Sequence, residues 1–212
     1  MNVMKRVAVC ALLAAGLWGA AVQAQSLPKI NEFYFDEDAA AKPAHALPPE
    51  QAGFGDQLMK LRQRHRKSTE ATVQLAGIAY AEGRAELGAK LYDEAMASIA
   101  GNSAQVRGIH WNQAWDLYRS GDAQAALTQW AQAAEGMRGN ASWVPPTLAL
   151  ALWKLDRRDE AVSWYAAAVR TEPEQWNNAA NFPQLLPQWK DEERATLAEV
   201  LQAWAAKPPA WP

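Results

Sequence analysis

The chain has 212 residues, half of them hydrophobic, which predicts one domain with an ordinary buried core. Its formal net charge of −2 gives no general attraction to nucleic acid or to anionic lipid, so we expect neither as a partner. The only cysteine, Cys10, lies in the N-terminal apolar run described next. We therefore expect a mature chain without disulfides, thiolate metal sites or a cysteine nucleophile.

Residues 1–24 have the features of a cleavable signal peptide. Lys5 and Arg6 form a basic start, residues 7–17 are apolar, and a small-residue pattern ends at Ala24. The apolar run is too short for a comfortable membrane span, so we expect cleavage after Ala24 and no stable membrane insertion of the mature chain. Loss of the two basic residues leaves 19 basic against 23 acidic residues. The segment predicts a periplasmic location.

Residues 25–53 predict an extended leader, because prolines interrupt any helix and residues 39–46 have low complexity. Within the leader, residues 30–38 form an aromatic cluster followed by acids. Two interpretations are open for this cluster. It is either a strand-like tether that packs its aromatic side chains against the first repeats, or a short linear motif offered to another protein.

Residues 54–175 predict alternating helices. The first stretch, Gly55 to Lys67, is amphipathic and rich in basic side chains, including His65 if it is protonated. These basic side chains either form a docking face for an acidic partner or membrane headgroups, or are simply solvated. The following helices are expected at about 69–82, 84–100, 104–120, 122–136, 143–155 and 157–171.

Residues 176–212 predict a helical cap and tail. A turn-rich piece at 176–183 is followed by Pro183 and Pro187, which bracket a short apolar stretch. A last helix, about Asp191 to Ala206, has one apolar stripe and three acids at its start, where they suit the helix dipole. Stacked helical repeats need such a terminal element to cover the exposed face of the last repeat.

The sequence contains no pattern that predicts catalysis. No HExxH, Gly-x-Ser-x-Gly or phosphate-binding glycine-rich loop is present. The three histidines, His45, His65 and His110, lie far apart in the sequence, and the acidic clusters at helix starts suit capping. We therefore expect no enzyme activity, no cofactor and no metal.

An internal repeat organises the middle of the chain. Residues of like size recur 35 positions apart, as expected for consecutive pairs of short amphipathic helices. Gly121 and Asp122 suit the end of one helix and the start of the next, and Pro173 ends the last pair. The matched positions are Ala114 and Ala149, Leu117 and Leu152, Ala126 and Ala161, Trp130 and Tyr165, and Ala133 and Ala168.

This pattern resembles the tetratricopeptide repeat (TPR) family over about residues 69–175. A weaker copy lies at 76–95, where Gly88 stands in place of the alanine that the motif usually has. The resemblance implies an all-α solenoid of about three helical hairpins, with a C-terminal capping helix and an extended N-terminal leader.

In the resembled family, the first helix of each hairpin lines a concave groove. Large aromatic side chains with flanking cations in such a groove suit an extended peptide. For Trp111, Trp115 and Trp153, groove and core positions are both open, and the leader or the C-terminal tail can occupy the groove in cis. The groove residues expected from the resemblance are Tyr80, Trp111, Asn112, Trp115, Tyr118, Arg119, Trp143, Trp153 and Lys154.

The resemblance implies a scaffold that binds a partner protein or peptide, in an assembly of the cell envelope. Members of the family that clamp a C-terminal carboxylate use asparagine with several cations, and here the neighbour of Asn112 is Trp111 instead. That clamp is not expected. The alternative function is a carbohydrate- or peptidoglycan-binding module, because tryptophan faces also stack on sugars.

Overall fold

The computed structural model describes residues 27–30, 35–63, 66–99, 101, 103–135, 137 and 139–210. The signal peptide predicted at 1–24 lies outside the described residues, as do Phe33 and Tyr34 of the aromatic cluster and His65. Most of the described chain is helical, which confirms the all-α class. The strands in the described residues are two-residue segments that pair in parallel, β1 (Phe35–Asp36) with β2 (Asn140–Ala141).

The long helices begin and end within a few residues of their predicted bounds, except at the first. The amphipathic stretch predicted over Gly55 to Lys67 is helical only to Arg62. Lys67 adopts a φ of 63°, outside the helical region, and turns the chain into the next helix. The helices are α1 (Phe54–Arg62), α2 (Ser68–Ala81), α3 (Ala85–Ala97), α4 (Ser103–Arg119), α5 (Ala123–Ala134), α6 (Val144–Lys154), α7 (Arg158–Thr171), α8 (Pro173–Trp176), η1 (Ala179–Asn181, 3₁₀), α9 (Phe182–Leu185) and α10 (Asp191–Ala206).

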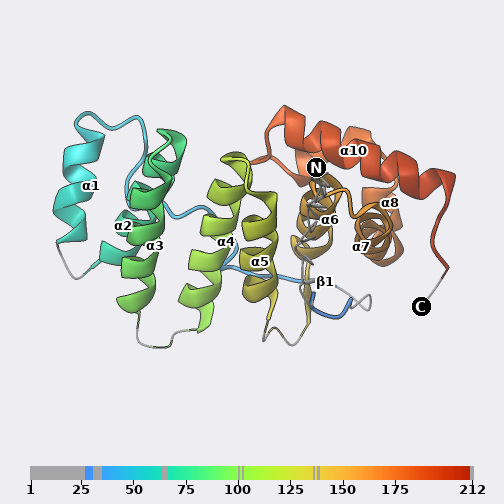
Figure 1. The fold of residues 1–212 in the computed structure, drawn as a ribbon, viewed down its shortest axis with the longest axis horizontal. Helices are drawn as coiled ribbons and strands as arrows, with labels where there is room; N and C mark the ends of the chain where they lie inside the picture. Colours follow the sequence, from blue (N-terminus) through green and yellow to red (C-terminus); the bar gives the residue numbers. More distant parts are fainter. Residues whose placement is uncertain are drawn as a thin grey trace, which may run out of the picture.

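Helices α2 to α7 form three consecutive pairs, α2 with α3, α4 with α5 and α6 with α7, which stand side by side in Figure 1. Alanines at matched positions of the pairs, such as Ala76, Ala114 and Ala149, have no exposed surface and allow close helix contact. Trp130 and Tyr165, also matched, are fully buried. The spacing of 35 residues between the second and third pairs, and of 38 between the first and second, therefore corresponds to equivalent packing positions.

The same turn joins the two helices of each pair. Its positive-φ residue is Gly83 in the first pair, Gly121 in the second and Asp156 in the third. The N–H of the next residue donates to a carbonyl five positions earlier, which satisfies a group that the helix end leaves unpaired. These bonds run from Arg84 to Ala79 (2.8 Å), from Asp122 to Leu117 (2.9 Å) and from Arg157 to Leu152 (3.0 Å).

We expect Asp156→Gly to raise the free energy of unfolding by about 0.5–1 kcal/mol. Asp156 holds a φ of 60°, which is unfavourable for a residue with a Cβ and free of strain for glycine. Its ion pair with Arg158 is largely exposed and contributes little. Urea unfolding of the variant and of Asp159→Gly, which is inside α7, measures the effect. Equal destabilisation by both changes would contradict the prediction.

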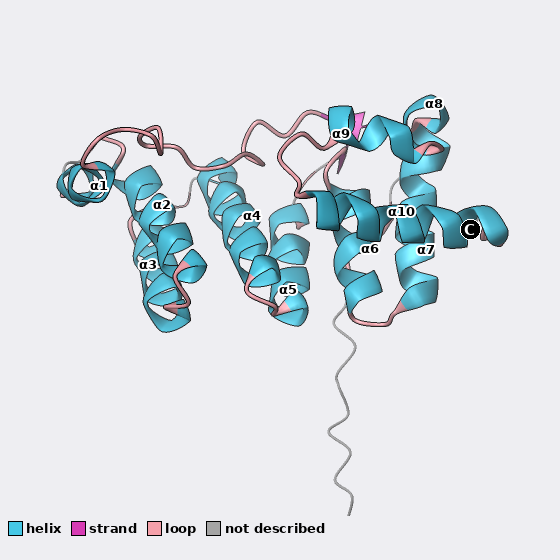
Figure 2. Ribbon diagram, turned by 90° about the horizontal axis from the view of Figure 1, so that it is seen from above, coloured by secondary structure: helices cyan, strands magenta, loops and turns pink. Residues whose placement is uncertain are grey.

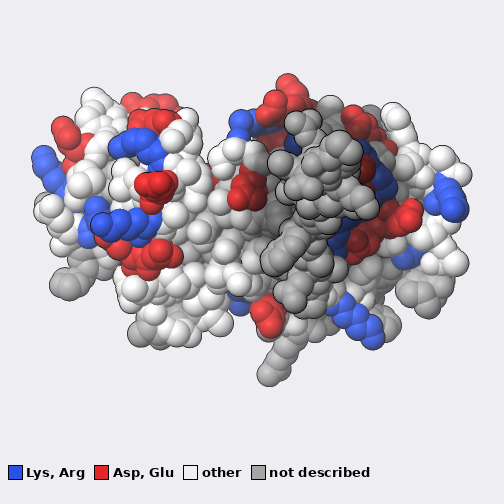
Figure 3. All heavy atoms as spheres, in the orientation of Figure 1, with Lys and Arg blue, Asp and Glu red and all other residues white. Residues whose placement is uncertain are grey.

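The two ends of the chain cover opposite parts of this row of helices. Helix α10 lies across α6 and α7, with Leu197 and Val200 fully buried (Figure 1). The leader runs beside α4, α2 and α1 in Figure 2, before it enters α1 at Phe54. Acidic and basic side chains of the described residues are intermixed on the face in Figure 3.

Candidate functional site

One stripe of α4 forms the wall of a cavity of about 670 Å³. Trp111, Asn112, Trp115, Asp116 and Arg119 all line it, and they follow one another at intervals of one, three or four residues, so that they share one face of the helix. The remaining lining comes from separate segments of the chain. It consists of Ala41, Pro43 and His45 of the leader, Ser142 and Trp143 before α6, Glu172, Gln175 and Trp176, and residues 185–189.

The leader is bound on this face through its backbone. The side-chain oxygen of Asn112 accepts a hydrogen bond from the N–H of Ala44 (3.0 Å), and the nitrogen donates to the carbonyls of Lys42 (3.0 Å) and Gly108 (2.8 Å). Gln74 of α2 makes equivalent bonds further along the leader. The two carboxamides therefore bind the backbone of residues 42–47 and not its side chains.

Gln74 lies on the first helix of the preceding pair. Its oxygen accepts from the N–H groups of Ala46 (2.9 Å) and Leu47 (3.2 Å), and its nitrogen donates to the carbonyl of Leu47 (2.8 Å). The Gln74 side chain therefore satisfies two N–H groups and one carbonyl of the leader backbone, as buried backbone groups require.

The start of the leader is fixed by charge and by close packing. The carboxylate of Asp38 accepts from Arg107 (3.2 Å) and from the indole N–H of Trp143 (3.2 Å). Asp36 lies so close to Gly139 that a Cβ atom on residue 139 would overlap the Asp36 carboxylate, at 1.3 Å from its oxygen. The described part of the cluster at 30–38 is strand-like and packs on the chain, but Phe35 lies on the core of the last two helix pairs and not on the first repeats, as the tether interpretation expected.

We expect Asn112→Ala to increase amide hydrogen exchange in residues 40–47 at least tenfold. The change removes the bonds to Ala44 and Lys42, and a loss of about 1.4 kcal/mol corresponds to a factor of ten. Exchange followed by mass spectrometry measures it. Gln113→Ala, at the next position of α4, is the matched control. Unchanged exchange in Asn112→Ala would show that the leader is held elsewhere.

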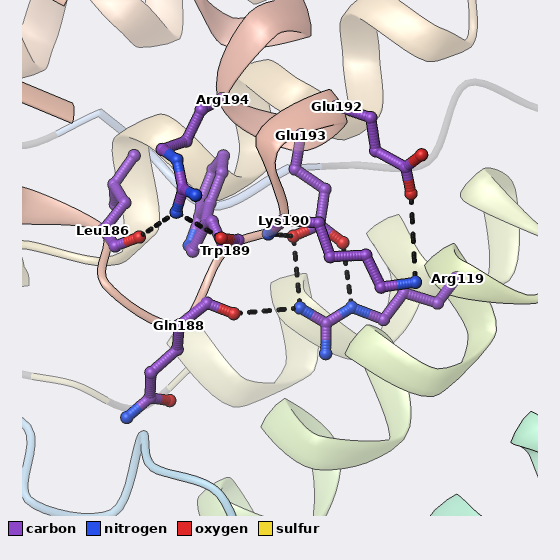
Figure 4. A network of polar contacts seen from close by, with 8 residues as sticks. All are labelled: Arg119, Leu186, Gln188, Trp189, Lys190, Glu192, Glu193 and Arg194. Carbon is purple, nitrogen blue, oxygen red and sulfur yellow. Dashed lines mark hydrogen bonds and ion pairs between the residues drawn. The ribbon is translucent and has the colours of Figure 1, made fainter. Parts of the chain in front are cut away.

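An ion-pair network fixes the segment opposite α4 (Figure 4). Arg119 donates to Glu193 of α10 through Nε (2.8 Å) and Nη2 (3.1 Å), and Nη2 also donates to the carbonyl of Gln188 (3.2 Å). Arg194 donates to the carbonyls of Leu186 (2.8 Å) and Trp189. The start of α10 therefore ties residues 186–189 to α4 and sets the width of the cavity.

Tryptophans dominate the cavity walls and continue into the core. Trp115 is 5% exposed and contacts Trp130 and Trp189 edge to face, with centroids 5.0 and 5.1 Å apart. Trp111 is 9% exposed and lies 6.0 Å from Trp115. For these two residues the structure decides between groove and core. They are core residues, and only a small part of each reaches the cavity.

The predicted groove residues do not all gather at one place. Five of them, Trp111, Asn112, Trp115, Arg119 and Trp143, line the cavity. The other four lie outside its lining: Tyr80, Tyr118, Trp153 and Lys154.

Tyr80 and Tyr118 pack between helices. The ring of Tyr80 lies against α3, where a Cβ on Gly88 would approach it to 2.4 Å, so the glycine in place of the usual alanine makes room for this ring. Tyr118 packs on Trp130, with centroids 5.8 Å apart. Neither residue belongs to an open groove, which corrects the expectation for both.

Trp153 and Lys154 lie at the far end of α6. The indole N–H of Trp153 donates to Glu199 of α10 (2.9 Å), and the guanidinium of Arg158 stacks on its ring at 3.9 Å. Lys154 is exposed beside it. Neither residue lines the cavity, and Trp153 contacts α10 instead.

Asp116 is the electrostatically unusual group of the cavity. Burial raises the pKa of its carboxyl from 3.8 to about 6, although the hydrogen bond from Tyr92 (2.5 Å) and the charge of Arg119 both lower it. Tyr92, in α3, is buried beside it, and burial and the Asp116 charge raise the pKa of the phenol. The carboxylate has one hydrogen-bond donor among the described residues.

Sequence reasoning missed Asp116, Glu172, Trp176 and Trp189. Asp116 could have been found, because it lies four residues after Asn112 and three before Arg119 and therefore shares their helix face. Nothing local places Trp189 on Trp115, 74 residues away, because that contact depends on how α10 docks.

Comparison with protein-family models, curated proteins and solved structures finds no match to the chain. Among the described residues, no cluster of three or more histidine, cysteine, aspartate or glutamate side chains is arranged to hold a metal ion. No helix in the described ranges has the length and apolar character needed to cross a membrane.

Proposed function

We propose that the chain is a periplasmic scaffold of the TPR type that binds an extended segment of a partner protein in a cell-envelope assembly, without catalysis or a cofactor. The observation that carries the proposal is the leader itself. Residues 37–53 contain no helix or strand and consist largely of turns and bends, and Asn112 and Gln74 bind their backbone on the first helices of successive pairs. Recognition of backbone groups in this way accommodates segments of different sequence.

The TPR assignment is supported by the recurring turns at Gly83, Gly121 and Asp156 and by the matched buried alanines. Each pair cannot bury its apolar face alone and stacks on its neighbours, which leaves one lateral face of first helices. The leader takes part of that face, and the cavity beside it is the part in which we place the partner.

Site-specific photo-crosslinking in the periplasm tests the proposal. A photoreactive amino acid replaces Ser142 or Gln175, which are exposed and line the cavity, or Lys90, which is exposed on α3 outside it. We expect a discrete protein adduct from the two cavity positions and none from Lys90. Adducts that form equally at all three positions, or at none, would reject the proposal. Adducts with glycan instead of protein would favour the carbohydrate alternative.

A further inference from the structure

The charges that line the cavity are predominantly acidic. Asp116 and Glu172 contribute carboxyl groups, Arg119 contributes the guanidinium, and His45 of the leader contributes an imidazole. That guanidinium is already held in two bonds by Glu193, whose side chain is 2% exposed, so its charge is neutralised inside the protein. The carboxylates of Asp116 and Glu172 have no cationic hydrogen-bond partner among the described residues.

The uncharged walls suit a cation as well. Five of the described tryptophans line the cavity. Trp143 is partly exposed, and the other four, which are at most 9% exposed, reach the cavity with a small part of each side chain: Trp111, Trp115, Trp176 and Trp189. The negative face of an indole ring attracts a guanidinium or ammonium group, by up to about 2 kcal/mol when the contact excludes water. Arg119 provides an internal example, because its guanidinium lies 4.7 Å from the centroid of Trp115.

The cavity is thus poorly suited to an anion and well suited to a cation. An anionic group would meet Asp116 and Glu172 and find the only lining guanidinium bound to Glu193. A cationic group would pair with a buried carboxylate that has a single donor, and would lower the elevated pKa of Asp116 by doing so.

We infer that the cavity receives a basic side chain, an arginine or lysine, of the bound partner segment. This inference rests on the proposed function for the partner and on the charge and aromatic lining for the cation. The backbone of the segment follows the leader side of the cavity, and its cationic group lies among the tryptophans, with Asp116 as its counter-ion.

Calorimetry and tryptophan fluorescence on the full mature chain test the inference with matched probes. Acetyl-arginine amide carries the guanidinium, and acetyl-citrulline amide has the same shape without the charge. We expect saturable binding of the first and at least tenfold weaker binding of the second. Asp116→Asn should weaken acetyl-arginine amide at least tenfold. Glu86→Gln, the same charge change at an exposed position of α3, should change it less than twofold.

Equal binding of the two amides, or an Asp116→Asn variant that binds like the unmodified chain, would overturn the inference. Tighter binding of choline than of acetyl-arginine amide would overturn the assignment to a side chain and favour a lipid headgroup. The test is separable from that of the proposed function. If the amides bind selectively by charge but no crosslinks form, only the partner segment is rejected. If crosslinks form but the amides bind without charge selectivity, only the cation is rejected.

Discussion

A Glu193→Gln variant is expected to lose about 2–3 kcal/mol of unfolding free energy. Glu193 is 2% exposed, accepts both bonds of Arg119, and also accepts from the backbone N–H of Lys190 (2.7 Å) at the start of α10. Removal of one partner of a buried ion pair costs about 3–5 kcal/mol, and the 32% exposure of the Arg119 side chain lowers this estimate. Urea unfolding followed by circular dichroism gives the value.

The neighbouring residue supplies the control for this measurement. Glu192 is 77% exposed, and its carboxylate pairs with the Lys190 ammonium at the long distance of 3.8 Å. Glu192→Gln should therefore change the unfolding free energy by less than about 0.5 kcal/mol. Equal effects of the two substitutions would mean that the ion pair of Glu193 does not hold α10. We also expect the quenching of tryptophan fluorescence by acrylamide to rise in Glu193→Gln alone, as Trp189 becomes accessible.

An Asp116→Asn variant is expected to be more stable than the unmodified chain at pH 7.5, by at most about 3 kcal/mol, and equally stable near pH 4. The folded carboxyl has a pKa of about 6 against 3.8 when unperturbed, so the folded chain binds the proton more tightly. Its stabilising contribution is therefore complete below pH 4 and is lost as the pH rises through 6. Asparagine stays neutral and retains an oxygen for the Tyr92 hydroxyl.

Unfolding by urea at several pH values between 4 and 7.5 measures this difference. The relevant quantity is the free energy of the variant minus that of the unmodified chain, which removes the contribution of other titrating groups. Asp93→Asn, the same substitution at an exposed position of α3, is measured alongside as the control. A flat difference for Asp116→Asn would mean that its carboxyl titrates normally in the folded chain.

Some residues of the candidate site can be predicted from the local sequence pattern, and others cannot. Asn112, Trp115 and Arg119 were found because one helical face carries them and the repeat pattern indicates which face is lateral. Trp153 is the counterpart of Tyr118, 35 residues earlier, and neither lines the cavity; Trp153 bonds to Glu199 of α10. That bond depends on α10, whose docking position has no local signal.

The sequence by itself determined the helices, their pairing and their turns. A 35-residue period of small and large side chains, with a turn residue such as Gly121, is local information, and helix pairs use mostly local contacts. The tertiary structure alone decided what covers the shared face. Asn112 binds Lys42 across 70 residues and Arg119 binds Glu193 across 74, and such contacts depend on the three-dimensional packing of segments that carry no mutual pattern in the sequence.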